Sequence, residues 1–332
     1  MSNVEIDVAN ARFWDELCGT SLAKALGATG RSMEDLRTFD RGYMDLYPYL
    51  LDRVPAATMR GKKVLEIGLG YGTLGQKIAE AGADYTGLDI AQGPVDMMNH
   101  RLKMQGLPGK AIQGSMLQCP LPDQSVDCVV SIGCFHHTGN VRRCIDETWR
   151  VLKPGGRAYL MVYNRFSYFR WIKWFGPTLR AALASNAGSA GTATESERWA
   201  YDSNAAGGAA PETVFLSRNQ LRGMLSRFTH VSLVLENCNP LSLRGLVLVS
   251  RPVLLPVLGP IAGLDIYISA QKRASGPWTY CCCATGPVAA WMRARSRITS
   301  TPLAGIRATA CRSCRSCASC RRRWTCRKST WS

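Results

Sequence analysis

A glycine-rich segment between a short apolar run and a helical pattern constrains this fold more than any other feature. Val64–Ile67 has the composition of a buried strand, and Gly68-Leu-Gly70-Tyr-Gly72 follows it before a helical stretch that runs to Ala81. Glycines at such a turn let the backbone approach a ligand closely, and the start of a helix offers unpaired N–H groups. The segment therefore predicts a strand–turn–helix unit that binds a nucleotide-like ligand.

Strand and helix patterns alternate after this turn. Short apolar strand patterns lie at Tyr85–Asp89, Ala111–Gln113, Val126–Ile132 and Arg157–Tyr163. Helical patterns separate them at Val95–Met104 and Val141–Leu152. Such alternation is typical of a parallel sheet covered by helices on both faces. We therefore predict an α/β, doubly wound fold, to which Val231–Leu235 and Leu264–Ser269 are candidates to add two strands.

The chain divides into regions of different pattern. Residues 1–58 read as helices and are expected to form an N-terminal cap, followed by a nucleotide-binding core at 59–165. Residues 166–272 are expected to supply a lid or substrate segment and the last strands. Within them, Tyr168–Leu183 is predicted to be one helix. For Leu246–Leu264 we favour core packing over contact with a membrane surface or a lipid-like acceptor, because its prolines would interrupt an amphipathic helix.

The formal net charge of +17 is concentrated at the end of the sequence. No Asp or Glu follows Asp265, whereas 13 of the 41 Lys and Arg residues lie between Lys272 and Lys328. Residues 1–265 hold 28 basic and 24 acidic groups, a net of +4. A nucleic-acid-binding protein favours a concentrated basic face, so nucleic acid is not expected as a partner except through the tail.

The tail at 273–332 has an unusual composition. Its cysteines at 311, 314, 317 and 320 have a spacing seen in iron–sulfur and zinc ligation. The tail lacks acids and is rich in Arg, Ser and Cys, as expected when a GC-rich gene is translated in a shifted frame. We therefore expect an irregular, poorly ordered or frameshift-derived tail. The alternative is a basic nucleic-acid arm with a metal knuckle.

The sequence also predicts the cellular compartment of the protein. No stretch has the roughly 18 uninterrupted apolar residues of a transmembrane helix. The first residues are acidic and lack the basic-then-apolar order of a secretory signal. We expect a cytoplasmic protein with reduced thiols and no transmembrane segment. The oligomeric state is not predicted.

Five blocks, in order and spacing, resemble the class I S-adenosylmethionine-dependent methyltransferases of the bacterial small-molecule type, with a methyltransferase type 11-like domain. The blocks span about residues 60–163 and are Glu66–Gly72, the strand-end Asp89, Leu121–Val130, Phe135-His136-His137 and Val151–Gly156. The resemblance implies a Rossmann-like seven-stranded sheet of order 3-2-1-4-5-7-6 with strand 7 antiparallel. It also implies S-adenosyl-L-methionine as the cofactor and a small-molecule methyl acceptor.

The resemblance assigns the cofactor contacts. The implied cofactor-binding positions are Glu66, Gly68, Gly70, Gly72, Asp89, Gly114, Ser115, Met116 and Ser131. Gly68 and Gly70 would approach the methionine part, Asp89 the ribose, residues 114–116 the adenine, and Ser131 the region near the sulfonium. Many relatives have Asp where Ser115 stands, but a serine can still accept a hydrogen bond. No metal is expected at this site.

Methyl transfer from a sulfonium needs a nucleophile held in line, so positioning supplies much of the rate. A hydroxyl or amine acceptor must also lose a proton, for which a histidine is suited. His137 is the first candidate base and His136 the second, although either could cap a helix or fill space. Tyr43 is a candidate for a cation–π contact with the sulfonium. Segments 13–19, 47–50 and 201–215 are expected to cover the substrate.

The sequence also fits other functions. Gly70, Gly72 and Gly75 also fit a dinucleotide fingerprint, with Asp89 placed for a ribose, so a nicotinamide enzyme is an alternative. Two further alternatives are an RNA methyltransferase and a non-catalytic S-adenosylmethionine-binding protein.

Overall fold

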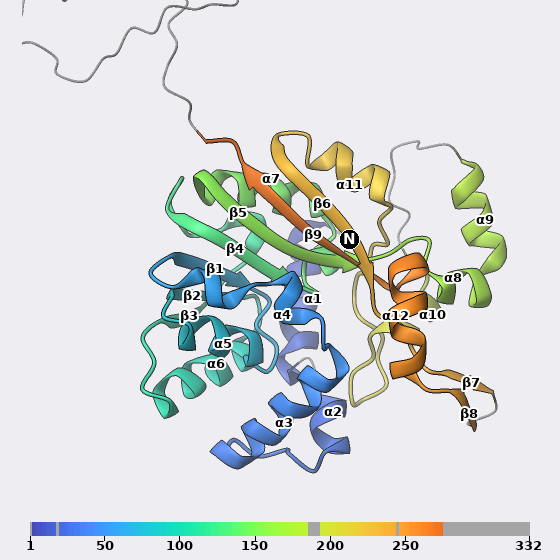
Figure 1. The fold of residues 1–332 in the computed structure, drawn as a ribbon, viewed down its shortest axis with the longest axis horizontal. Helices are drawn as coiled ribbons and strands as arrows, with labels where there is room; N and C mark the ends of the chain where they lie inside the picture. The colour runs from blue at the N-terminus through green and yellow to red at the C-terminus, as the bar shows by residue number, and fades with distance from the viewer. Residues whose placement is uncertain (1, 18–19, 185–192, 244–245, 275–332) are drawn as a thin grey trace, which may run out of the picture. The chain divides into compact units, whose positions relative to one another are not determined.

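A seven-stranded sheet runs through the protein (Figure 1). The computed structural model describes residues 2–17, 20–184, 193–243 and 246–274, and residues 1–274 form one compact unit. The strands of the sheet are β1 (Lys63–Ile67), β2 (Asp84–Asp89), β3 (Lys110–Gln113), β4 (Val126–Ile132), β5 (Leu152–Tyr163), β6 (Phe228–Glu236) and β9 (Asp265–Lys272). Their order is β3-β2-β1-β4-β5-β9-β6. Strands β1 to β5 are parallel, and β9 is antiparallel to both of its neighbours.

This arrangement confirms the predicted sheet. β9 is the seventh strand of the sheet in chain order, and it lies between β5 and β6 as strand 7 of the expected order does. The two late apolar runs became β6 and β9, both longer than the runs themselves.

Helices cover both faces of the sheet. The flanking helices are α5 (Thr73–Glu80), α6 (Gln92–Met104), α7 (Val141–Val151), α11 (Arg218–Met224) and α12 (Arg251–Ala262). In β1, Val64 packs with residues of α5, α6 and α12, whereas Leu65 and Ile67 pack with residues of α7 and α11. Successive side chains of a strand point to opposite faces, so the two clusters lie on opposite sides. The predicted doubly wound α/β class is confirmed.

The N-terminal segment is helical and packs against the glycine turn. Its helices are α1 (Asn3–Phe13), α2 (Thr20–Ala25), α3 (Met33–Leu46) and α4 (Leu50–Arg53). Helix α3 begins at Ser32, whose hydroxyl accepts from the N–H of Asp35 in a reciprocal capping box. Phe39 of α3 is buried and stacks on Tyr71, with 4.0 Å between ring centroids. This stacking holds the helical segment over the loop between β1 and α5.

The predicted helix Tyr168–Leu183 is two helices. α8 (Tyr168–Lys173) ends at Trp174, and α9 (Phe175–Leu183) begins directly after it. Pro177 explains the break, because proline has no N–H for the carbonyl of Lys173 and its ring would clash with that carbonyl in a continuous helix. Helix α10 (Glu195–Tyr201) follows.

The expectation that prolines prevent a helix in 246–264 is wrong. β7 (Leu241–Leu243) pairs with β8 (Leu246–Val249), and α12 continues through Pro256 and Pro260. Both prolines are exposed, so the carbonyls four residues earlier, which lose an N–H partner, can bind water instead. Leu255 is buried but Val257 is exposed, so the expected core packing holds for one face of α12 only.

Two expectations concern the rest of the chain. In the described ranges, no helix combines the length and apolar character needed to cross a bilayer. The tail from Ser275 onward, with its four regularly spaced cysteines, lies outside the described residues.

Candidate active site

A cavity of about 290 Å³ lies at the carboxyl ends of the parallel strands. Its floor includes the turn after β1, the end of β2, and the residues that follow β3 and β4. Ligands of open α/β sheets bind at this edge. The lining also includes aromatic side chains, among them Trp14, Tyr43, Tyr47, Tyr201 and Tyr267. All three segments expected to cover a substrate therefore contribute a residue to the cavity wall.

The glycine turn has a backbone that other residues adopt with difficulty. Gly68, Gly70 and Gly72 have φ values of 78°, 50° and 79°, in the left-handed region. A Cβ on Gly68 would lie 2.6 Å from the Cβ of Cys134, and one on Gly72 would lie 2.9 Å from Cδ of Arg101. The turn thus requires glycine for both conformation and space, and it brings bare backbone to the cavity.

Asp89 is held rigidly at the end of β2. Its Oδ2 accepts from the N–H of Leu69 at 2.7 Å, and its Oδ1 accepts from the N–H of Ala91 at 3.0 Å. Burial raises the pKa of Asp89 to about 6, although the backbone hydrogen bonds oppose this shift. A carboxylate can accept about four hydrogen bonds, so capacity remains for hydroxyl donors in the cavity.

Glu66 lies on β1 under the turn. It is buried, and its Oε2 accepts from the hydroxyl of Tyr85. Burial raises the pKa of Glu66 to about 8, so the neutral acid predominates at neutral pH. Gly75 of α5 leaves room for this carboxyl, because a Cβ there would lie 2.4 Å from Oε2. Gly75, which the dinucleotide fingerprint includes, thus serves packing against Glu66.

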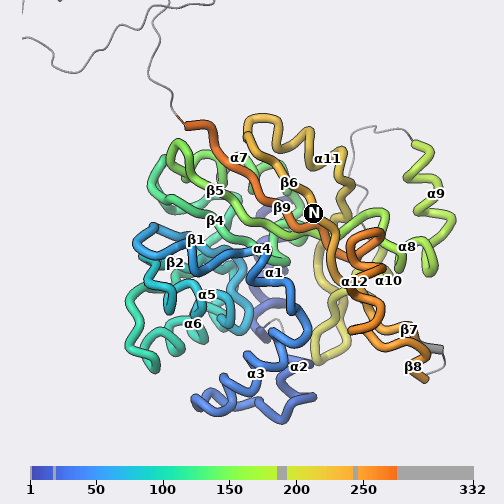
Figure 2. The backbone as a smooth tube through the Cα atoms, viewed as in Figure 1, coloured from blue at the N-terminus to red at the C-terminus, as the bar shows by residue number. Residues whose placement is uncertain are grey.

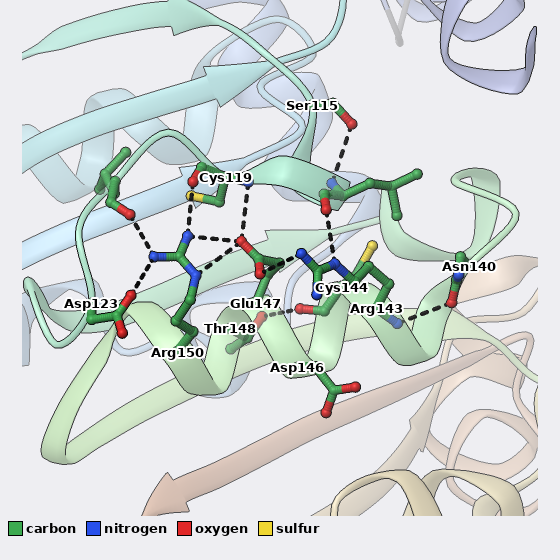
Figure 3. Close-up of polar contacts among 12 residues, drawn as sticks. Ser115, Cys119, Asp123, Asn140, Arg143, Cys144, Asp146, Glu147, Thr148 and Arg150 are labelled. Atoms are coloured by element: carbon green, nitrogen blue, oxygen red, sulfur yellow. Dashed lines mark hydrogen bonds and ion pairs between the residues drawn. The ribbon is translucent and has the colours of Figure 1, made fainter. Parts of the chain in front are cut away.

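The segment after β3 is tied to α7. Gly114, Ser115 and Met116 line the cavity. The hydroxyl of Ser115 accepts from the N–H of Leu117 at 3.2 Å, and the carbonyl of Leu117 accepts from Nε of Arg143 at 3.0 Å (Figure 3). The Ser115 oxygen has a second lone pair for another donor.

Arg150 extends this network along α7. Its guanidinium bonds Glu147 at 2.7 Å, the carbonyl of Cys119 at 2.8 Å and Asp123 at 2.7 Å (Figure 3). Asp123 therefore has a structural contact. Together these bonds fix the loop that carries residues 114–116.

Ser131 lies behind the cavity wall. It is 1% exposed, and the residues that line the wall beside it are Ile132, Gly133 and Cys134. The end of β4 is therefore at the cavity, while the Ser131 side chain is buried in the sheet.

The two histidines have different environments. His137 lines the cavity, with Nδ1 2.8 Å from the carbonyl oxygen of Glu212 and 3.2 Å from the hydroxyl of Thr213. His136 is fully buried, and its ring centroid lies 3.9 Å from that of Tyr163. Burial lowers the pKa of His136 well below its usual value, so its ring stays neutral. The cavity wall includes His137 and does not include His136 among the described residues.

Sequence reasoning missed an acidic group beside His137. Asp202, at the end of α10, has Oδ2 3.6 Å from Nε2 of His137, and it accepts from the hydroxyl of Tyr163 at 3.0 Å. Burial raises the pKa of Asp202, while His137 and the Tyr163 hydroxyl oppose that shift. Tyr163 ends β5 at the ligand-binding edge of the sheet, a position that could have marked it. Asp202 lies in segment 201–215, which was expected to cover the substrate, but no motif marked its carboxyl group as a partner of His137.

Comparison with known proteins agrees with this geometry. Residues 65–160 match a family model described as a methyltransferase domain. The chain carries a class I S-adenosylmethionine-dependent methyltransferase domain. The matched residues run from β1 into β5 and thus include the glycine turn, Asp89 and both histidines.

Relatives of the methyltransferase domain cover part of the chain. The chain is 29% identical over 147 residues to a demethylmenaquinone methyltransferase from Tropheryma whipplei, across 42% of this chain and 60% of the relative. It is 30% identical over 124 residues to a ubiquinone biosynthesis O-methyltransferase from Dechloromonas aromatica, across 36% of this chain and 53% of the relative. The chain thus spans little more than half of these relatives.

A solved structure of similar fold is an S-adenosylmethionine-dependent methyltransferase from Mesorhizobium loti. It is 18% identical, has a TM-score of 0.46, and covers 68% of this chain and 97% of its own.

The cofactor of such a domain is S-adenosyl-L-methionine, and the cavity fits it. Gly68, Gly70 and Gly72 bring backbone without side chains to the cavity wall, and Asp89 keeps acceptor capacity for ribose hydroxyls. Tyr43, expected near the sulfonium, is on the cavity wall. Among the described residues, no group of three His, Cys, Asp or Glu side chains is placed to hold a metal ion.

Proposed function

We propose that this protein transfers the methyl group of S-adenosylmethionine to a hydroxyl or amine of a small-molecule acceptor. The acceptor atom attacks the methyl carbon in line, the carbon–sulfur bond breaks, and its electron pair stays on sulfur to leave S-adenosylhomocysteine. The observation that carries the proposal is the meeting of the glycine turn, Asp89 and His137 in one cavity. Holding two reactants in line accounts for much of the rate of such a displacement.

The cofactor contacts follow from the positions of the predicted residues. Gly68, Gly70 and Gly72 would approach the methionine part, and Asp89 would accept from the ribose hydroxyls. Residues 114–116 would contact the adenine. Glu66 is buried and lines the cavity, where it would border the cofactor, and the buried Ser131 would support the end of β4 near the sulfonium.

His137 is better supported than His136 as the base that takes the acceptor proton. The carbonyl of Glu212 can only accept, so Nδ1 of His137 carries its hydrogen and Nε2 keeps a lone pair. This tautomer assignment follows from the hydrogen-bond network. Nε2 faces Asp202, which lines the same cavity, so a proton taken up there has a carboxyl group beside it. Asp202 would then stabilise the imidazolium and is proposed as a positioning residue.

A small-molecule acceptor agrees with the charge and the walls of the site. The body of the protein is nearly balanced in charge, which disfavours an extended polyanion. The cavity is bordered by aromatic rings, which suit an acceptor with an apolar body. Two relatives are named for demethylmenaquinone methylation and for ubiquinone biosynthesis.

The test combines a binding and a turnover measurement on the purified chain. Calorimetry with S-adenosylmethionine is expected to show one site per chain, and Asp84→Asn at the exposed start of β2 should leave it unchanged. A screen of phenols, quinols and small amines is expected to release S-adenosylhomocysteine with some of them. Binding of NAD without S-adenosylmethionine would support the nicotinamide alternative. Cofactor binding with methylation of RNA alone would overturn the small-molecule proposal.

A further inference from the structure

α12 and the β7–β8 hairpin carry an exposed apolar surface. We call Leu246, Val247 and Leu248 of the hairpin with Val253, Val257 and Ile261 of α12 the apolar strip; each is more than half exposed. Every exposed residue of α12 is apolar, because the remaining ones are Pro252, Pro256 and Pro260. A group of large exposed apolar side chains such as this one is typical of an interaction site.

A second set of exposed apolar side chains lies on α8 and α9. Ile172, Phe175 and Leu183 of α8 and α9 are each more than half exposed. The loop before β7 is tied to the start of α8, since the N–H of Asn239 donates to the hydroxyl of Tyr168 at 2.8 Å. Figures 1 and 2 show α8, α9, α12 and the hairpin on one side of the molecule.

The charged residues of these segments are all basic. No Asp or Glu occurs among residues 148–194 or among residues 237–264. Lys173 of α8 and Arg180 of α9 are exposed beside the apolar side chains. A second copy of this chain would bring like charges together, whereas an anionic surface would attract them.

We propose that the apolar strip, with α8 and α9, docks onto an anionic phospholipid bilayer. The aliphatic side chains would enter the boundary between headgroups and acyl chains, and Lys173 and Arg180 would remain at the headgroups. The opposite face of α12, through Leu254, Leu255 and Leu258, packs in the cluster whose partners Tyr47 and Tyr267 line the cavity. Docking would therefore bring the cavity wall close to the bilayer, whether or not methyl transfer takes place.

Vesicle sedimentation of the full chain tests the proposal. Vesicles of phosphatidylcholine with phosphatidylglycerol are compared with vesicles of phosphatidylcholine alone. The test variant is Val257→Gln with Ile261→Gln, and the matched control is Met104→Gln, which replaces a side chain 46% exposed at the end of α6. All three proteins keep the 13 basic residues from Lys272 to Lys328, so nonspecific binding through that segment is common to them.

We expect the wild type to bind the anionic vesicles more tightly than the neutral ones. The test variant should bind the anionic vesicles at least tenfold more weakly, because two aliphatic side chains no longer contribute to insertion, and the control should stay within twofold of the wild type. If the test variant fails to fold, Leu246→Gln with Leu248→Gln removes apolar surface from the hairpin and should weaken binding in the same direction. Undiminished binding of the folded variant would overturn the proposal. So would a wild-type dimer, seen by light scattering, that the substitutions convert to a monomer while vesicle binding stays absent.

Discussion

Nε2 of His137 lies 3.6 Å from Oδ2 of Asp202 inside the cavity, and the hydroxyl of Tyr163 donates to the same carboxyl group at 3.0 Å. The three side chains come from the loop after β4, the end of α10 and the end of β5. All three side chains line the cavity, so a proton taken up by His137, as we propose, would have the Asp202 carboxyl group beside it.

Replacing His137 tests its role as base. His137→Gln is expected to lower kcat by about 10²–10⁴-fold, because general base catalysis contributes about that much. The affinity for S-adenosylmethionine should change little, because His137 makes none of the proposed cofactor contacts. Asp202→Asn should cause a smaller loss and alter the pH profile of kcat. Full activity of His137→Gln in a single-turnover assay would remove His137 from the mechanism.

Removing the charge of Asp89 tests the ribose contact. Asp89→Asn is expected to weaken S-adenosylmethionine binding about 10–150-fold, equal to the roughly 1.5–3 kcal/mol of hydrogen bonds to a charged group. Binding by the wild type should also weaken as the pH falls below about 6, because the carboxyl then gains a proton and loses acceptor capacity. Calorimetry between pH 5 and pH 8 measures both effects. Equal affinity for the variant and the wild type would show that the ribose binds elsewhere.

The raised pKa of Glu66 predicts that the free energy of unfolding depends on pH. Burial raises its pKa to about 8, so the native carboxyl keeps its proton at pH values where the unfolded one has lost it. The contribution of the protonated Glu66 carboxyl to the free energy of unfolding is fully present below about pH 4 and is lost as the pH rises toward 8. Glu66→Gln mimics the protonated acid and should have a higher Tm than the wild type at pH 8. The control Glu34→Gln, at an exposed position of α3, should leave Tm unchanged, and an unchanged Tm in both variants would refute the prediction.

Alanine variants of Gly68 and Gly61 separate the cost of a left-handed backbone from the cost of a steric clash. Both have left-handed backbone, but a Cβ on Gly68 would lie 2.6 Å from Cys134 while one on Gly61 meets nothing within 4 Å. Gly61→Ala should cost about 1–2 kcal/mol of unfolding free energy from backbone strain alone. Gly68→Ala should cost more and should also weaken cofactor binding. Urea unfolding compares the two, and equal losses would mean that the loop moves to accept the methyl group.

Local patterns predicted most of the nucleotide-binding half correctly. β1, β2 and β4 lie within a residue or so of their apolar runs, because a buried parallel strand leaves a continuous hydrophobic signal. The helices around Pro177 and in α12 were mispredicted in opposite directions. The helix predicted as continuous breaks at Trp174, before Pro177, whereas α12 continues through Pro256 and Pro260. All three prolines are exposed, so exposure to water does not by itself decide whether a proline breaks a helix.

Residues 60–163, taken as a sequence, predicted β1 to β5 and the glycine turn from local patterns, because apolar runs and turn motifs are short-range signals. The order of the sheet was implied by the resemblance to a known family and not by these local patterns. Only the tertiary structure decided which histidine reaches the cavity, since His136 and His137 are neighbours and differ by what packs around them. It likewise brought Asp202 to His137 and left one face of α12 exposed. Burial and contact between distant segments create these properties, and neither is encoded at a single position.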